Sequence, residues 1–259
     1  MANVCNYDIG EGAQIQLHKG VFADFPAEKL QAVAERVRTE EYRHFKMGKF
    51  NCKFPRKQLV FKNEYKFSRQ LFTPCQEQFD LIEACAQHFC ATYGGDVENL
   101  VVLVNGYFTK DDYISDHSDD EPGLAAGKPV GTYIFGGAAG RFVFTSKAQN
   151  PTTKMEFEPS HGDAIFMTGE QFQRNWLHGV PKFKGGKKGW EKMAAENPEF
   201  PWRLSVTIRI NGNGDAPQKR GRRNRGPGEA EVAKREAKRE AKRAREEEEG
   251  GAAAAKRAK

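Results

Sequence analysis

The sequence predicts a mostly β domain of the α+β class, with two helices near its N-terminus and a charged tail behind it. Between residues 100 and 210, short apolar runs alternate with Gly, Asp, Asn and Pro, a spacing typical of strands in a barrel or sandwich. Two stretches before residue 100 have helical periodicity instead. Beyond residue 211 large apolar residues almost disappear, so the tail cannot form a core.

The N-terminal region is predicted to contain one strand, at 15–22, and two helices. The first helix, at 26–39, begins with Pro26, which a first helical turn tolerates because an amide there has no helical acceptor. The second helix follows Thr73, its expected N-cap, and ends at Gly94. Its apolar stripe is interpreted as core and consists of Phe79, Ile82, Ala86, Phe89 and Tyr93. The strands expected after it are 100–107, 130–135, 141–145, 155–158, 164–167 and 203–210.

Length and composition favour one domain plus an appendage. A chain of 259 residues with 38% apolar residues can bury one substantial core. No apolar run is long enough to span a bilayer and no secretory leader is recognisable, so we expect an intracellular protein. The five cysteines form no CxxC pair and are odd in number, which favours reduced thiols over disulfides or a zinc site.

The excess positive charge lies in the tail. Residues 212–259 contain 15 Lys and Arg against 9 Asp and Glu, whereas the rest of the chain balances at 26 against 26. The tail opens with a basic cluster at 219–225 and continues as an Ala/Lys/Arg/Glu repeat, so we expect disorder or a lone solvated helix. The cluster is expected to contact phosphates or to act as a nuclear-import signal, and the nucleus is the expected location, with the cytoplasm as the alternative.

A candidate metal site begins with His117 and Asp119. Residues two apart on an extended backbone face the same side, so both side chains can bind one ion. A second histidine from a later strand would complete a two-histidine, one-carboxylate triad, which leaves positions on a non-haem ferrous iron open for a cosubstrate and oxygen. A polar turn is the alternative interpretation of this motif taken alone.

The strand expected at 203–210 carries a second signal. Alternation places Arg203, Ser205, Thr207 and Arg209 on one face and apolar residues on the other. Arginines on the inner face of a strand require anionic partners, because burying an unpaired guanidinium is costly. A dicarboxylate such as 2-oxoglutarate offers one carboxylate to each arginine.

Together these motifs resemble the AlkB-type iron(II)- and 2-oxoglutarate-dependent dioxygenases, in particular the branch that dealkylates nucleic acids and, within it, the duplex-DNA repair members. Separated pieces in the right order are specific evidence where any one would be weak. The matching pieces are Asn105-x-Tyr107, His117-x-Asp119-x-Glu121, Pro129-Val130, Phe142-Val-Phe144, Gly162-Asp163, His178-x-Val180-Pro181 and Arg203-x5-Arg209.

The resemblance implies a double-stranded β-helix, a jelly-roll variant whose interior holds Fe(2+) bound by His117, Asp119 and His178. His161 competes for the third position, but it lies in a predicted turn, whereas His178 matches the His-x-Val-Pro element of the family. Alanine at any of the three ligands is expected to abolish turnover and to leave the fold largely intact.

The implied organisation has three parts. Residues 1–49 form a supporting strand and helix, residues 50–211 form the dioxygenase domain with a nucleotide-recognition lid at about 50–72, and residues 212–259 form the tail. The segment 182–201 is longer than its family counterpart and carries five lysines. It is expected to be either a solvated insert or a phosphate contact.

The resemblance also implies the residues that bind the cosubstrate. Arg203 pairs with the far carboxylate of 2-oxoglutarate and Arg209 serves the iron-proximal end, while Asn105 and Tyr107 supply neutral hydrogen bonds. The family often has Asn where Ser205 stands, so a hydroxyl would replace part of that contact. The implied reaction uses O2 to hydroxylate an N-alkyl carbon, converts 2-oxoglutarate to succinate and CO2, and releases an aldehyde from the repaired base.

Substrate recognition is expected from the lid. Tyr65 and Phe67 are two apart on an extended stretch and face one pocket. The resemblance implies that Phe67 stacks on a flipped base, which must recover its lost stacking, while Tyr65 hydrogen-bonds with the base and Glu121 lies near its exocyclic group. Alternatively, both rings are core aromatics. Arg56 is a further expected substrate contact.

Met47 is expected to act as an apolar wedge in the gap left by the flipped base, or else to be an ordinary loop residue. The favoured function is oxidative dealkylation of N-alkylated bases in DNA by a monomer, with RNA as a second candidate substrate. The alternatives are a regulatory RNA demethylase of the same fold and a nucleic-acid-binding module without activity. The intact triad and both arginines argue against the inactive module.

Overall fold

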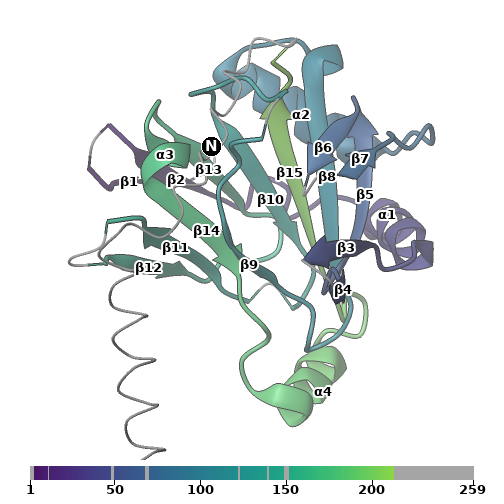
Figure 1. The fold of residues 1–259 in the computed structure, drawn as a ribbon. Helices are drawn as coiled ribbons and strands as arrows, with labels where there is room; N and C mark the ends of the chain where they lie inside the picture. Colours follow the sequence, from purple (N-terminus) through teal and green to yellow (C-terminus); the bar gives the residue numbers. More distant parts are fainter. Residues whose placement is uncertain are drawn as a thin grey trace, which may run out of the picture. The chain divides into compact units, whose positions relative to one another are not determined.

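β-Strands dominate the part of the chain that the structure describes. The computed structural model describes residues 3–10, 12–47, 50–67, 70–121, 123–138, 140–148 and 152–212, with the backbone alone at residues 46 and 47. Within these ranges the strands form a larger sheet, a smaller sheet that faces it, and two separate hairpins (Figure 1). No helix of the described ranges is long and apolar enough to cross a membrane.

Both sheets are built from antiparallel pairs. From edge to edge the larger sheet contains β1 (Asn3–Asp8), β2 (Gln14–Lys19), β13 (Ala164–Thr168), β10 (Val130–Phe135), β15 (Arg203–Ile210), β8 (Leu100–Tyr107) and β5 (Lys57–Lys62). The smaller sheet contains β12 (Lys154–Phe157), β11 (Phe142–Ser146), β14 (Trp176–Val180) and β9 (Ile114–His117). The hairpins join β3 (His44–Met47) to β4 (Phe50–Lys53) and β6 (Tyr65–Phe67) to β7 (Gln70–Phe72).

Two helices, α1 (Ala27–Thr39) and α2 (Asp80–Tyr93), pack on one face of the larger sheet, against β5, β8 and β15 (Figure 1). Strand alternation turns Leu204, Val206 and Ile208 of β15 toward these helices, where all three are fully buried. The main apolar core therefore lies between the two helices and the larger sheet.

The other face of the larger sheet looks toward the smaller sheet. Apolar side chains from both sheets meet there, among them Ile134 of β10 and Phe144 of β11. On β15 the same face carries the polar side chains Arg203, Ser205, Thr207 and Arg209, none of them more than 5% exposed. The predicted fold class, a mostly β jelly roll with helices on one sheet, is confirmed, and its polar residues lie between the sheets.

The N-terminal part is integral to the larger sheet. β2 pairs with β13 and β1 pairs with β2, so the strand predicted at 15–22 is present as β2, although it ends at Lys19 and residues 20–22 form a turn. β1 is an additional strand. β1 has an exposed, mixed polar sequence, which carries little of the apolar signal that marks a strand.

The prediction of Thr73 as an N-cap is wrong. α2 begins at Asp80, and its N-cap is Phe79, which makes no side-chain capping hydrogen bond. The preceding segment stays extended because the Cys75 amide donates to the Val60 carbonyl of β5 at 2.7 Å, which takes the chain along the sheet edge. The C-terminal end is as predicted, with Gly94 at a φ of 77°.

Three short helices complete the described ranges: the 3-10 helix η1 (Val97–Asn99), α3 (Phe172–Asn175) and α4 (Gly186–Glu196). α4 lies in the segment 182–201, where no helix was predicted. It is anchored by Trp190, whose ring meets Phe183 edge-on at 5.3 Å, and by the buried Met193. Beyond Gly212 the tail lies outside the described residues.

Candidate functional site

The site is built where β9 meets β14. His117 and His178 are direct partners across these strands, and the register shifts by one residue between His178 and Val180. Gly179 makes this close pairing feasible, because a Cβ there would lie 2.7 Å from Asp116 Oδ1 and 3.0 Å from the Ile114 carbonyl oxygen. The local sequence therefore brings two imidazoles side by side.

Asp119 follows β9 and joins the two histidines. His178 Nε2 lies 3.4 Å from Asp119 Oδ2, and His117 Nε2 lies 3.8 Å from Asp119 Oδ1. One ligand atom from each residue lies within 4.8 Å of the others. The Asp119 amide donates to Gln173 Oε1 at 2.8 Å, so α3 helps to hold the carboxylate, a role that no sequence signal indicated.

The donor set fits a ferrous ion. His117 Nδ1 lies 3.0 Å from the Ser115 carbonyl, which can accept only from an N–H, so Nε2 keeps the lone pair that a metal needs. Burial, together with the neighbouring His178, lowers the pKa of His117 to about 3, which keeps the ring neutral. Asp119 Oδ2 is buried without a hydrogen-bond partner and faces His178. Two imidazoles and a carboxylate form the facial triad that leaves positions open on iron(II).

Arg209 adds a positive charge beside this cluster. Its Nη2 donates to Asp119 Oδ1 at 2.5 Å, and both side chains are almost fully buried. Burial raises the pKa of Asp119, but the Arg209 guanidinium and His178 outweigh it and lower that pKa below its usual range. Asp119 is therefore a carboxylate at neutral pH.

A small cavity of about 20 Å³ opens beside the histidines. Its polar walls come from β8, β10 and β15, and they include most of the residues that were expected to bind the cosubstrate. The lining residues are Asn105, Tyr107, Ile114, His117, Thr132, Phe142, His178, Gly179, Val180, Ser205, Thr207 and Arg209.

Arg203 lies at the far end of this region. It is 1% exposed, donates to the Ser205 hydroxyl at 3.2 Å and the Arg141 carbonyl at 3.4 Å, and lies 5.5 Å from the centre of the Tyr107 ring. Burial lowers its pKa to about 10, partly offset by Tyr107, so the guanidinium stays charged. A buried cation of this kind is stabilised by an anionic ligand.

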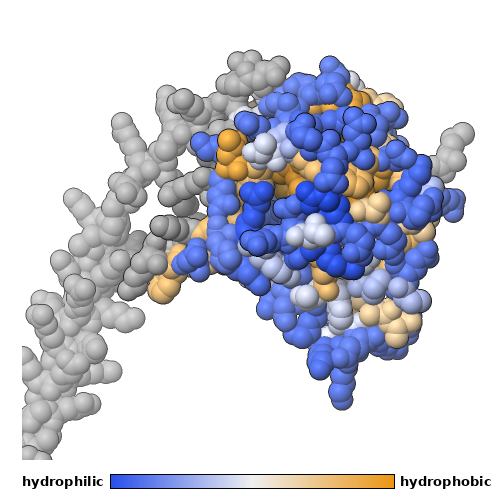
Figure 2. Space-filling model, turned by 90° about the vertical axis from the view of Figure 1, so that its right-hand side faces the viewer, coloured by the Kyte–Doolittle hydropathy of each residue, from blue (hydrophilic) through white to orange (hydrophobic). Residues whose placement is uncertain are grey.

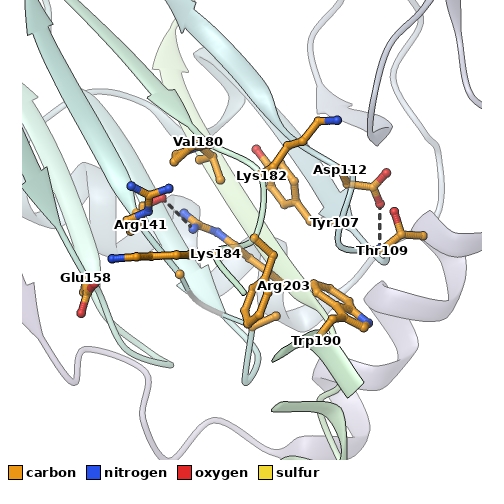
Figure 3. A pocket seen from close by; sticks show the side chains of 14 residues that line it. Tyr107, Thr109, Asp112, Arg141, Glu158, Val180, Lys182, Lys184, Trp190 and Arg203 are labelled. Atoms are coloured by element: carbon orange, nitrogen blue, oxygen red, sulfur yellow. Dashed lines mark hydrogen bonds between the residues drawn. The ribbon is translucent and has the colours of Figure 1, made fainter. Parts of the chain in front are cut away.

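A second cavity, of about 250 Å³, is lined in part by Arg203 and shares Tyr107 and Val180 with the small one. Figure 3 shows Arg141, Lys184 and Arg203 on one side of it, with Tyr107 and Trp190 nearby. The segment that contains α4 therefore forms part of the wall next to the Arg203 end of the site.

Asn105 and Arg56 are linked deep in the sheet. Arg56 Nε donates to Asn105 Oδ1 at 2.7 Å, and Gln58 Nε2 donates to the same oxygen at 3.2 Å. Arg56 is only 3% exposed. The expected contact of Arg56 with substrate stays a prediction, and sequence reasoning missed its contact with Asn105.

Of the two lid aromatics, Tyr65 lies within electrostatic reach of Asp119. The rings of Tyr65 and Phe67 are stacked at 6.0 Å with planes 11° apart. Tyr65 is buried, hydrogen-bonds with Glu121 and lies 5.2 Å from the Arg209 guanidinium, whereas Phe67 is only partly buried. Burial and the nearby Asp119 raise the pKa of Glu121 to about 7, against the opposing effect of Arg209.

Two further residues considered in the sequence analysis are His161 and Met47. His161 Nδ1 accepts a hydrogen bond from the Gly136 amide at 3.1 Å and its ring stacks on Phe200, so it serves a turn, as its sequence context indicated. Met47 ends β3, and its side chain lies outside the described part of the structure.

Comparison with known proteins gives a consistent match. The family model of the 2OG-Fe(II) oxygenase superfamily matches residues 11–209. The DNA oxidative demethylase ALKBH2 of Mus musculus is 30% identical over 136 residues, which are 49% of this chain and 55% of the relative. The human ALKBH2 is 29% identical over 136 residues, 49% of this chain and 50% of the relative. The chain thus matches about half the length of these curated relatives.

A solved structure, "The structure of OsALKBH1", matches with a TM-score of 0.45 and 18% sequence identity. The match covers 80% of this chain and 100% of that one.

Proposed function

Because the chain belongs to the 2OG-Fe(II) oxygenase superfamily, we propose that it is an AlkB-type dioxygenase that oxidatively removes alkyl groups from bases in DNA. The observation that carries the proposal is the cluster of His117, Asp119 and His178 beside a polar cavity. The relatives named DNA oxidative demethylase support DNA as the substrate. RNA is the second candidate substrate.

In this proposal His117, Asp119 and His178 bind Fe(2+). When bound, iron with O2 and 2-oxoglutarate supplies the oxidising chemistry: one oxygen atom enters succinate, CO2 leaves, and the other oxygen atom enters the N-alkyl carbon. The C–N bond of the hydroxylated product then breaks: its electron pair returns to the base nitrogen, the hydroxyl group loses its proton, and the carbon leaves as an aldehyde.

The remaining polar residues position the cosubstrate. Arg203, buried at the far end, pairs with one carboxylate of 2-oxoglutarate, and Arg209 lies toward the iron-proximal carboxylate. Asn105, Tyr107 and Ser205 line the same region and supply neutral hydrogen bonds. The apolar packing around them limits access of water, which strengthens these polar contacts.

The hairpins next to the site form the proposed substrate side. Phe67 stacks on the flipped base, with Tyr65 and Glu121 near its polar edge, and Arg56 and Met47 remain proposed contacts. Phe50 of β4 is 62% exposed and Leu71 of β7 is 56% exposed, so both hairpins present large apolar side chains outward. On the face that Figure 2 shows, hydrophobic residues gather in the upper half of an otherwise mostly hydrophilic surface.

In the proposed organisation, residues 50–211 carry the chemistry, residues 1–49 support them, and the tail adds affinity. A flexible cationic segment such as 219–225 gains affinity by releasing counterions from phosphates. Deleting residues 212–259 is expected to weaken DNA binding and flatten its salt dependence, with turnover at saturating substrate unchanged. Equal affinity of both proteins across a salt series would instead favour a nuclear-import role for the cluster.

One assay tests the proposed reaction. The full chain is given Fe(2+), ascorbate and 2-oxoglutarate in air with methylated single- and double-stranded DNA and RNA, and the bases are analysed by mass spectrometry. We expect loss of methyl groups from DNA with matching amounts of formaldehyde and succinate, and no reaction with His178→Ala. Demethylation of RNA alone would establish the regulatory RNA demethylase instead. Absence of both succinate and demethylated base would refute the dioxygenase assignment.

A further inference from the structure

Arg56 and Asn105 form a hydrogen bond in which the donor and the acceptor can be assigned from chemistry alone. A guanidinium has only N–H donors, so the Asn105 atom that Arg56 Nε meets at 2.7 Å must be the amide oxygen. Gln58 approaches that same oxygen at 3.2 Å through its own amide nitrogen. Two donors from β5 and the residues before it therefore hold the Asn105 oxygen.

This arrangement determines what Asn105 presents to the cavity. The oxygen and the NH2 group of a carboxamide diverge from one planar trigonal carbon, so fixing the position of one fixes that of the other. Asn105 lines the small cavity together with Tyr107, Ser205 and Arg209. With its oxygen held on the β5 side, the NH2 group is the part of the amide available to an anion in that cavity.

Without Arg56, the amide would lose its main constraint. An Asn side chain can rotate by half a turn about its last bond and exchange the positions of oxygen and nitrogen with little change in shape. The flipped amide would turn its oxygen toward a carboxylate, and two acceptors would repel each other. Gln58 alone is a weaker constraint, because it is a neutral donor at a longer distance.

Arg56 is buried, which favours a structural contact within the protein over a contact at its surface. It is 3% exposed, its Nη2 is buried without a hydrogen-bond partner, and Tyr65, Tyr107 and Arg209 lie within electrostatic reach. The adjacent Lys57 differs in both respects, since it is half-buried and its amine donates to the Arg38 carbonyl at the surface. Lys57 is the first residue of β5, whereas Arg56 lies in the bend that precedes the strand.

We propose that Arg56 is a positioning residue for the cosubstrate: by holding Asn105 Oδ1 it directs the Asn105 NH2 group toward the dicarboxylate. The proposal rests on the proposed function, since it concerns binding of 2-oxoglutarate. It gives Arg56 a part in cosubstrate binding that does not require nucleic acid. Its effect is expected even when no DNA is present.

The test measures binding of 2-oxoglutarate to the full chain by titration calorimetry, with Mn(2+) in place of iron and no nucleic acid. Arg56→Ala is expected to weaken binding at least tenfold. Lys57→Ala, the matched loss of a neighbouring cation, is expected to bind as the wild type does. Thermal unfolding and Mn(2+) affinity identify any variant that fails to fold, and Arg56→Lys then replaces Arg56→Ala, with a smaller loss expected from the less directional donor.

A double-mutant cycle separates positioning from general structural damage. If Arg56 acts through Asn105, then Arg56→Ala added to Asn105→Leu causes no further loss of 2-oxoglutarate affinity. Full additivity of the two losses would overturn the proposal. So would an Arg56→Ala protein that binds 2-oxoglutarate normally and loses only DNA affinity. A wild-type protein that binds no 2-oxoglutarate would instead refute the proposed function itself.

Discussion

Asp119 has two roles: it is one of the three candidate metal ligands, and it forms a buried ion pair with Arg209. Its side chain is fully buried and accepts from Arg209 Nη2 at 2.5 Å. Removing one partner of a buried ion pair leaves the other charge uncompensated, at a cost of roughly 3–5 kcal/mol. We therefore expect Asp119→Ala to lower the free energy of unfolding by this amount even without metal, measured by urea denaturation. The expectation that all three ligand variants keep the fold largely intact is thereby revised for Asp119.

His117→Ala is the comparison for this prediction. The His117 ring is neutral in the fold, so its loss leaves Asp119 still paired with Arg209. The unfolding free energy of His117→Ala is therefore expected to change far less, while metal binding is still lost. Equal stability of the two variants would show that the Arg209 pair contributes little to the fold.

Phe67 is the lid residue whose role a single substitution can decide. Its ring is partly buried, lies nearly parallel to that of Tyr65, and meets the Phe54 ring at 5.7 Å. Phe67→Ala is expected to cost roughly 1–3 kcal/mol of DNA binding, the usual scale for stacking of one base. The conversion of 2-oxoglutarate to succinate without DNA should be unaffected. Parallel loss of both activities would identify Phe67 as a core residue.

At the level of elements, the metal site depends on how closely β9 approaches β14. A Cβ at Gly179 would lie 2.7 Å from Asp116 Oδ1 and 3.0 Å from the Ile114 carbonyl, so Gly179→Ala must push the strands apart. Because His117 and His178 face each other across this pair, we expect metal affinity to fall roughly 10- to 100-fold, the scale of changes next to metal ligands. Competition against a fluorescent chelator measures it.

Gly189→Ala in α4 is the control for Gly179→Ala. The nearest atom to a Cβ there is 3.5 Å away, an ordinary contact, so metal affinity should not change. Unchanged affinity in Gly179→Ala as well would mean that the strands can separate without moving the imidazoles.

Elements with strong periodicity could be predicted, and elements defined by tertiary contacts could not. β8, β10 and β15 have the predicted bounds because each is a long apolar or alternating run. α4 was missed because its sequence contains two glycines and few apolar residues. The metal-ligand candidates could be predicted because they lie in short sequence motifs. The contact of Arg56 with Asn105 could not, because it depends on the register of β5 against β8, which a local sequence pattern does not reveal.

For the whole molecule, two histidines at the contact between α2 and the larger sheet, the buried His18 and the half-buried His88, contribute to the dependence of stability on pH. Burial lowers the pKa of His88, and burial together with His88 lowers the pKa of His18, so both are neutral in the fold. In the unfolded chain the pKa of each is about 6.5. Below that pH the unfolded state binds more protons, so stability is expected to fall as the pH drops through and below this value.

Thermal melting at pH 7.5 and 5.5 checks this prediction. In the wild type the melting temperature should fall on acidification, and that of His88→Gln should fall less, because this variant lacks one of the histidines whose pKa the fold lowers. His88 Nδ1 lies 2.9 Å from the Tyr133 hydroxyl, to which Gln can also hydrogen-bond. An identical drop in both proteins would place the pH sensitivity elsewhere.

The position of β15 in the sheet has a consequence for the chain as it leaves the ribosome. This strand, made last among the described elements, inserts between β10 and β8 in the middle of the larger sheet. Until Arg203–Ile210 has emerged, β8 and β10 each lack a neighbour, and β2 must wait for β13, made about 150 residues later. Both arginines of the proposed cosubstrate site, Arg203 and Arg209, belong to β15. A nascent chain therefore cannot bind 2-oxoglutarate before its sheet can close, and premature termination yields a chain without the site rather than a partly active enzyme.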